Sequence, residues 1–145
     1  MSESTQARQL VVFTLGAEQY ALPIQQVHEI IRYAEPRSVA SRVAWVRGVI
    51  SLRGRIIPVY DLAARLGVSS DLTEQTKIVI VEAGTETAGV IVDDVEEVLT
   101  IEDEQIEEVP GADATLIESI VKVGDRLVVL LKPSSIFAGM ELAAA

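Results

Sequence analysis

The chain has 145 residues, of which 49% are apolar, and its 22 Asp or Glu against 12 Lys or Arg give a formal net charge of −10 at pH 7. This length fits one domain of ordinary size, or two small subdomains that share a core, and argues against a multidomain enzyme. The negative charge disfavours nucleic-acid binding, and the absence of cysteine excludes disulfides, thiolate nucleophiles and thiolate metal sites.

The first apolar segments predict a hairpin followed by a mixed element. Gln9 to Leu15 is a short apolar run, and the turn at Gly16 to Glu18 leads into a return strand at Gln19 to Pro23. Ile24 to Ile31 fits a helical stripe as well as a strand. We therefore expect a helical turn that leads into a strand.

The clearest strand pair comes after a loop at Arg32 to Ala44. Gly48 to Leu52 and Arg55 to Tyr60 are joined by Arg53-Gly54, where glycine can take the positive φ of a tight turn. Arg53 is therefore expected at a hairpin tip. A short helix should follow, with Asp61 as N-cap and a stop at Gly67.

The second half of the chain contains further short strands. Beyond a polar loop at Val68 to Gln75, a second hairpin is predicted from Thr76 to Glu82 and Thr87 to Val92, and then a single strand from Val95 to Ile101. Glu102 to Ala114 is too acidic for a core element and is predicted to be a surface loop.

The last predicted hairpin runs from Ile117 to Val123 and from Arg126 to Leu131, across Gly124-Asp125. A closing helical turn is expected at Pro133 to Phe137. About nine to ten short strands with no long helix indicate an all-β domain of barrel or sandwich type, and two small barrels would account for their spacing.

Charge is divided unevenly along the chain. Residues 1–66 contain eight Lys or Arg and five Asp or Glu, whereas residues 67–145 contain four and seventeen. This asymmetry fits two halves that present different surfaces to different partners, and it fits equally well a simple role in solubility. No apolar run could span a bilayer, and the polar N-terminus lacks the pattern of a secretory signal, so a cytoplasmic location is expected.

The sequence contains little that could carry catalysis. The only histidine, His28, lies in an apolar-spaced segment and is expected to be a surface or packing residue rather than a base or ligand. The acidic residues near Asp93 lack the spacing of a calcium loop, and no phosphate-binding or nucleophile motif is present. We expect no enzymatic activity, no cofactor and no metal.

Four segments together resemble the CheW family of chemotaxis coupling proteins. They are Val12 to Gly16 with Tyr20 and Val27 to Ile30, then Val46 to Leu62, Gly89 to Asp93, and Gly124 to Leu127. The stretch from Val46 to Leu62 is the specific one, with its Leu-Arg-Gly turn and its Pro-Val-Tyr-Asp-Leu exit. The resemblance implies a single CheW-like domain over residues 8–140.

The resemblance further implies two intertwined five-stranded SH3-like barrel subdomains that share a core, with short helical turns. The approximate limits are residues 15–82 for the first subdomain, and residues 87–131 plus the N-terminal strand for the second. It also implies a non-enzymatic adaptor, monomeric in isolation, that couples the cytoplasmic tip of a chemoreceptor to the regulatory domain of a CheA-type histidine kinase. Such a protein is recruited to receptor arrays at the inner face of the membrane without inserting into it.

Six residues carry the partner-binding role that the resemblance implies. They are Val27, Glu29, Ile30, Arg53, Val98 and Leu99. For the four apolar residues ordinary core packing is an equal alternative, and Arg53 could instead be a solvated hairpin tip. We expect Glu29 and Arg53 to form a charge-assisted pair beside the receptor groove.

Three departures from the family pattern affect turn geometry or the kinase-binding face. Ser51 stands where the family usually has Asn, Ser119 where it often has Gly, and Lys132-Pro133 where a polar or acidic residue is commoner. The alternatives to a free-standing adaptor are a fragment of a CheA-type regulatory domain, the adaptor half of a CheV-like protein, or a β-barrel that binds a small ligand in an enclosed cavity. The Met1 start favours the adaptor.

Overall fold

A computed structural model shows that the chain folds into two β-sheets, and it describes residues 7–40, 44–108 and 116–134. The strands are β1 (Arg8–Leu15), β2 (Glu18–Pro23), β3 (Val27–Arg32), β4 (Val46–Leu52), β5 (Arg55–Asp61), β6 (Lys77–Ala83), β7 (Glu86–Val92), β8 (Asp94–Ile101), β9 (Ile106–Glu107), β10 (Ile117–Val123) and β11 (Arg126–Leu131). Within these ranges the helical elements are two short 3-10 turns, η2 (Ile24–Gln26) and η3 (Asp103–Gln105), and the helix α1 (Leu62–Leu66), and Pro133 and Ser134 are also helical.

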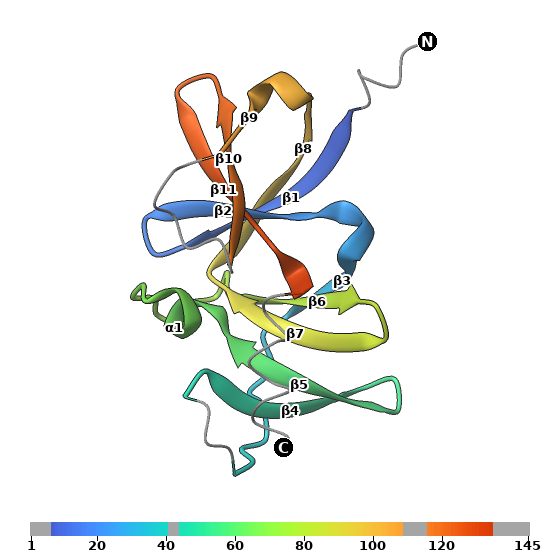
Figure 1. Cartoon of the computed structure of the whole chain (residues 1–145). Coiled ribbons are helices and arrows are strands. Elements are labelled where there is room, and N and C mark those ends of the chain that lie inside the picture. The colour runs from blue at the N-terminus through green and yellow to red at the C-terminus, as the bar shows by residue number, and fades with distance from the viewer. Residues whose placement is uncertain (1–6, 41–43, 109–115, 135–145) are drawn as a thin grey trace.

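The two sheets are intertwined by the path of the chain. One sheet has six strands in the order β8-β1-β2-β11-β10-β9, and the other has five in the order β3-β6-β7-β5-β4. Figure 1 shows the first and last strands of the chain together in the upper sheet, where the blue hairpin β1-β2 lies beside the orange hairpin β10-β11. The expected all-β fold of two intertwined subdomains is confirmed.

The sheets do not follow the sequence limits that we expected for the subdomains. β2 falls within residues 15–82 but belongs to the six-stranded sheet, and β7 falls within residues 87–131 but belongs to the five-stranded sheet. The physical reason is hairpin pairing: each of these strands stays with the strand before it, β1 or β6, to which a tight turn connects it.

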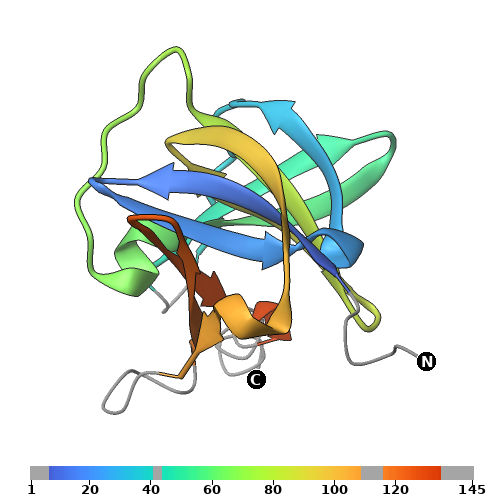
Figure 2. The same cartoon turned by 90° about the horizontal axis from the view of Figure 1, so that it is seen from above.

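The two sheets repeat one pairing plan in circularly permuted order. In each sheet, an edge strand pairs with the first strand of one hairpin, and the second strand of that hairpin runs parallel to the second strand of another hairpin. The resulting strand orders are β3-β6-β7-β5-β4 and β8-β1-β2-β11-β10. Figure 2 shows the long gold β8 arching over the blue hairpin at the outer side of its sheet. Corresponding residues of the two sheets can therefore be identified from the strand registers.

The main core lies between the sheets. Phe13, Leu15 and Leu22 of the six-stranded sheet are buried together with Val79 and Val81 of the five-stranded sheet. Each sheet also has a smaller core on its other face, built around Leu10 and Val12 in one case and around Ile78 and Ile80 in the other. This three-part core follows from the alternation of strand side chains between two faces.

Most local predictions are confirmed. The segment after Pro23 is a 3-10 turn that continues as a strand. The Asp61 side chain caps α1 by accepting a hydrogen bond from the backbone N–H of Ala64 at 3.1 Å, and Gly67 ends the helix with a φ of 78°.

The acidic segment predicted as a loop at Glu102 to Ala114 is more ordered than expected. It begins with η3 and the two-residue strand β9, because Glu102 and Gln105 cap one another across the turn and Ile106 packs against the core of the six-stranded sheet. Residues 109–114 lie outside the described part, as does most of the turn expected at Pro133 to Phe137.

Within the described ranges, no helix has the length and apolar character needed to cross a membrane.

Candidate functional site

Strand β3 forms an edge of the five-stranded sheet and carries three of the predicted partner-binding residues. Val27 packs against the core between the sheets, whereas Ile30 is 40% exposed. A bulge at His28 separates the pairing of Val27 with Val81 from that of Glu29 with Ile80.

Strand β8 forms the corresponding edge of the six-stranded sheet and carries the other two apolar residues. Leu99 pairs with Leu10 and packs against the smaller core around Leu10 and Val12, whereas Val98 pairs with Val11 and is 52% exposed. Core packing therefore accounts for Leu99 and in part for Val27, but it does not account for Ile30 or Val98.

Ile30 and Val98 lie on the faces by which the two sheets pack together. Directly paired residues share a sheet face, so Ile30 shares a face with Val79, and Val98 shares one with Val11 and, one strand further, with Leu22. Val79 and Leu22 belong to the core between the sheets. The two exposed side chains thus continue that apolar core to the outer edges of both sheets, where a partner could cover them.

Arg53 occupies a strained turn position and pairs with Glu29. Among the described residues it is the one non-glycine with a positive φ, 52°, and Gly54 follows with a φ of 82°, as a two-residue type I′ turn requires. The Arg53 Nη1 donates a hydrogen bond to Oε2 of Glu29, so the predicted ion pair is present. It links the tip of the β4-β5 hairpin to the edge strand β3.

The ion pair changes the ionisation of both partners. The hydrogen bond from Arg53 lowers the pKa of Glu29, and electrostatic interactions with Arg53 and His28 contribute less, although partial burial opposes this change. The hydrogen bond to Glu29 raises the pKa of Arg53. Both groups are therefore charged over the physiological pH range.

The side chains considered as candidates for catalysis or metal binding, His28 and Asp93, make contacts that support the local structure. The Nδ1 of His28 lies 3.6 Å from Oε2 of Glu82, and both side chains are largely exposed on neighbouring strands. Asp93 accepts a hydrogen bond from the backbone N–H of Gly16 at 2.8 Å and so fixes the β1-β2 turn. In the described part of the chain, no three His, Asp or Glu side chains are grouped so as to hold a metal ion.

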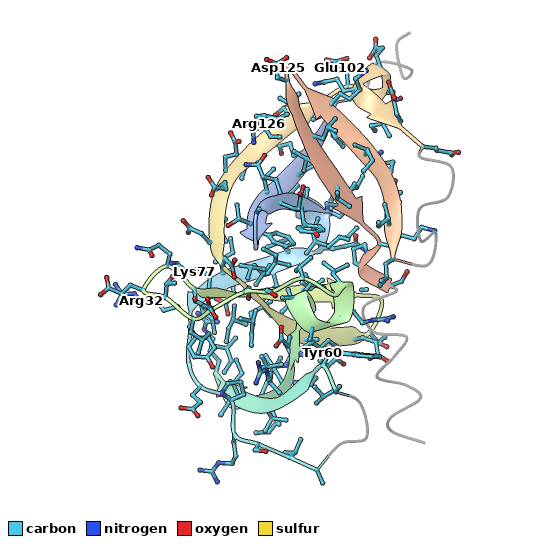
Figure 3. All side chains as sticks on the ribbon, turned by 90° about the vertical axis from the view of Figure 1, so that its left-hand side faces the viewer. Arg32, Tyr60, Lys77, Glu102, Asp125 and Arg126 are labelled. Carbon is cyan, nitrogen blue, oxygen red and sulfur yellow. The ribbon has the colours of Figure 1, made fainter. Side chains whose placement is uncertain are left out.

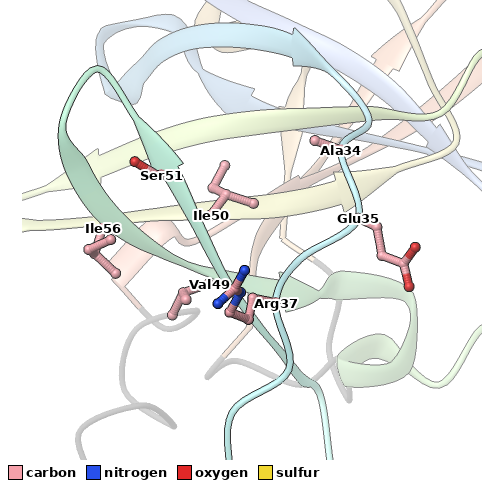
Figure 4. Close-up of a pocket in the computed structure, with 7 residues that line it drawn as sticks. All are labelled: Ala34, Glu35, Arg37, Val49, Ile50, Ser51 and Ile56. Atoms are coloured by element: carbon pink, nitrogen blue, oxygen red, sulfur yellow. The ribbon is translucent and has the colours of Figure 1, made fainter.

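A second apolar feature is an open pocket of about 430 Å³ beside β4. Figure 4 shows the segment containing Ala34 and Arg37 crossing the β4-β5 hairpin, with Val49 next to Arg37 and Ile56 on the next strand. Arg37 and Val49 exchange backbone hydrogen bonds of 2.8 and 2.9 Å, which anchor the crossing. Ile56 is 68% exposed at the rim of this pocket.

The three departures from the family pattern occupy different environments. Ser51 is exposed and lines the pocket beside Ile56. Ser119 is buried at a bulge that begins β10, and its hydroxyl has no hydrogen-bond partner among the described residues. The backbone N–H of Lys132 donates to the carbonyl of Leu116 at 2.9 Å, and Pro133 is buried.

Two features escaped the sequence analysis because no motif marks them. One is the exposed Ile56 beside the pocket, and the other is an ion pair between Arg126 of β11 and Glu97 of β8. Figure 3 shows Arg126 close to the turn at Asp125, near the outer end of the six-stranded sheet. Knowledge of which strands pair would have revealed both features, since each depends on contacts between distant segments.

Comparison with known proteins identifies the family. A family model described as CheW-like domain matches residues 9–141. The chemotaxis protein CheW of Klebsiella aerogenes is 31% identical over an alignment that covers 99% of this chain and 89% of that protein, and that of Bacillus subtilis is 30% identical over 93% and 90%. The crystal structure of the scaffolding protein TtCheW from Thermoanaerobacter tengcongensis matches with a TM-score of 0.83 and 35% identity, covering 88% of this chain and 90% of that one. The chain therefore belongs to the CheW-like domain family.

Proposed function

We propose that this protein is a non-enzymatic adaptor that couples a chemoreceptor to a CheA-type histidine kinase in chemotaxis signalling. Its relatives include chemotaxis proteins and a scaffolding protein, and they match it over nearly their whole length. The adaptor acts in the cytoplasm by binding both partners at once. It needs no cofactor and no metal ion.

The observation that carries this proposal is the pair of exposed apolar side chains at the two sheet edges. Ile30 and Val98 extend the core between the sheets to the surface, and the partly exposed Val27 packs against the same core, whereas Leu99 packs on the other face of its sheet. An apolar helix surface of a receptor tip would cover them and exclude water, which is the main source of affinity at such contacts. The Glu29-Arg53 pair would orient the β3 side of this surface.

A coupling function also requires a second surface. We assign the regulatory domain of the kinase to the pocket beside β4, because Ile56 is exposed at its rim and Val49 and Ile50 line it. Ile56 and Ile30 lie on different strands of the five-stranded sheet, β5 and β3. A substitution at one of them can therefore be tested for its effect on one partner alone.

Reciprocal substitutions test the assignment. The wild-type chain, Ile30→Asp and Ile56→Asp would each be titrated by calorimetry with a receptor-tip fragment and with the regulatory domain of a CheA-type kinase. Burying a new carboxylate against an apolar partner surface is costly, so we expect each variant to weaken binding to one partner by about 30-fold or more. Binding to the other partner should change by less than about threefold.

Val39→Asp provides a matched control, because Val39 is also exposed but belongs to neither surface. It should leave both affinities unchanged. If wild-type protein bound neither cognate partner, the adaptor function would be rejected. If it bound both, but the Ile30 and Ile56 variants behaved like the Val39 variant, the assignment of the two surfaces would be rejected instead.

A further inference from the structure

The strand registers make β3 and β8 equivalent residue by residue. In β3 the order is Val27, a bulge at His28, and then Glu29 opposite Ile80. In β8 it is Val95, a bulge at Glu96, and then Glu97 opposite Val12. The exposed Ile30 and Val98 are the next residues in their strands, and each pairs with a buried valine.

An ion pair is attached to the equivalent glutamate in both sheets. Glu29 is bound by Arg53, and Glu97 is bound by Arg126, whose Nη2 donates a 2.6 Å hydrogen bond to Oε2. In both cases the arginine comes from the hairpin that completes the sheet, β4-β5 or β10-β11. Each pair therefore connects an edge strand to a hairpin that it does not contact through backbone hydrogen bonds.

The two arginines reach their glutamates from different positions in the hairpin. The residue that corresponds to Arg53 is Gly124, which has no side chain, and Arg126 corresponds to Arg55. Arg55 donates to Oγ1 of Thr87 at 3.2 Å, and Arg126 makes the corresponding bond to Oε1 of Gln19 at 3.1 Å. Arg126 therefore combines the contacts that Arg53 and Arg55 make separately.

These contacts restrain the part of β8 that presents Val98. An edge strand has backbone partners on one side only, and the bulge at Glu96 interrupts even those. The bond to Glu97 holds the strand immediately before Val98 from the opposite direction. Both side chains of the pair are 39% exposed, so the pair is expected to contribute little to the free energy of unfolding.

We propose that Glu97 and Arg126 are positioning residues for receptor binding and that they do for Val98 what Glu29 and Arg53 do for Ile30. The inference rests on the proposed function, since the receptor tip is the partner that both edges contact. The receptor surface is then built twice from one plan. Each copy has an exposed apolar residue, a preceding glutamate and an arginine from the closing hairpin.

Charge reversal and restoration test the inference in the full-length chain. Arg126→Glu and Glu97→Arg should each weaken binding of a receptor-tip fragment by about fivefold to twentyfold, while the double variant with both changes should recover to within about threefold of wild type. Recovery is feasible because Gln19, which accepts a hydrogen bond from Arg126, can instead donate one from its amide group to a glutamate at the same position. Binding of the kinase regulatory domain should change by less than about twofold in all three proteins.

The same measurements on Lys122→Glu, Glu107→Lys and their combination provide a matched control. That pair is a 3.2 Å surface ion pair of the same sheet, but it lies on β10 and β9 at the opposite edge. Its variants should leave receptor binding unchanged. Thermal unfolding would show whether each variant is folded, and the milder Arg126→Gln replaces Arg126→Glu if that protein does not fold.

The reference for this experiment is Arg53→Glu. If Arg53→Glu weakened receptor binding and the Arg126 and Glu97 variants did not, or if the double variant failed to recover, the inference would be wrong while the proposed function stood. If wild-type protein failed to bind the receptor fragment at all, the proposed function would fail with it. A parallel loss of kinase binding in the Arg126 variants would indicate a general structural role and would also overturn the inference.

Discussion

Strands β3 and β8 occupy the same place in the two sheets, at the free edge beside the first strand of a hairpin. Both have a bulge, then a glutamate held by an arginine, and then an exposed apolar residue. Their charges differ. The bulge residue is His28 in one and Glu96 in the other, and the cation at Arg32 corresponds to the neutral Thr100.

This comparison separates what the fold repeats from what it varies. Figure 3 shows Arg32 beside Lys77, its partner on β6, whereas the corresponding residues of the six-stranded sheet, Thr100 and Gln9, are neutral. The apolar contact is therefore duplicated, but its electrostatic surroundings are not. A partner with two similar apolar surfaces would be bound by both edges, and charge would determine which surface meets which edge.

The largest expected effect is a difference in stability between two truncations, one at a buried and one at an exposed residue of the same row across the six-stranded sheet. Val98, Val11 and Leu22 are neighbours on one face, but Leu22 is fully buried and Val98 is exposed. Leu22→Ala should lower the free energy of unfolding by about 2 to 5 kcal/mol, because it leaves a cavity between the sheets. Val98→Ala should lower it by less than about 1 kcal/mol.

Chemical denaturation of both variants, with receptor binding measured in parallel, checks this contrast. Val98→Ala should weaken receptor binding in a protein of nearly normal stability. A loss of several kcal/mol in the Val98 variant would show that this position belongs to the core and not to the partner surface.

A second comparison concerns the bulges that begin β4 and β10, where Gly48 corresponds to Ser119. Gly48 has a φ of 144°, and a Cβ at this position would overlap the carbonyl oxygen of Arg37 in the segment that crosses β4. Gly48→Ala should therefore lower the free energy of unfolding by about 2 kcal/mol or more. Ser119→Gly should lower it by about 1 kcal/mol or less, because its hydroxyl has no partner among the described residues.

The two melting temperatures, measured in one buffer, decide this point. If both variants lost the same number of degrees in melting temperature, the close approach of the crossing segment to Gly48 would not be important for the stability of the five-stranded sheet.

The smallest effect is a pH dependence confined to the β3 edge. Because the bond from Arg53 lowers the pKa of Glu29 below its ordinary value of 4.5, the folded-state pKa lies below the unfolded-state pKa. The stabilising contribution of the pair is therefore fully present above the unfolded-state pKa and is lost as the pH falls through the folded-state pKa.

Carboxyl NMR titration of the wild type and of Arg53→Ala measures this directly. The pKa of Glu29 should be higher in the variant, and the difference in stability between the two proteins should disappear in acid. An unchanged pKa for Glu29 would mean that the ion pair does not form in solution.

Much of the fold could be predicted because its signals are local. The alternation of apolar residues and the turn at Arg53-Gly54 marked the hairpins, and Asp61 with Gly67 marked the helix. The sheet to which each strand belongs could not be predicted, since β2 pairs in parallel with β11 from the far end of the chain. No periodicity encodes such a contact between distant strands.

The candidate site shows the same division. The Glu29-Arg53 pair was predictable because the family resemblance marks both residues, and the structure contains it. The exposure of Ile30 and Val98 could not be separated from core packing by sequence, because both lie in strands whose other apolar residues are buried. Arg126 and Glu97 are 29 residues apart and become neighbours only through strand pairing.

The most direct test of the adaptor function is whether one molecule binds both partners together. The chain would be saturated with the kinase regulatory domain and then titrated with the receptor-tip fragment, and the mass of the complex would be measured by light scattering. We expect a ternary complex, with a receptor affinity within about threefold of that measured without the kinase domain. Displacement of one partner by the other would show that they share a single surface, and it would contradict the coupling of receptor to kinase through this protein.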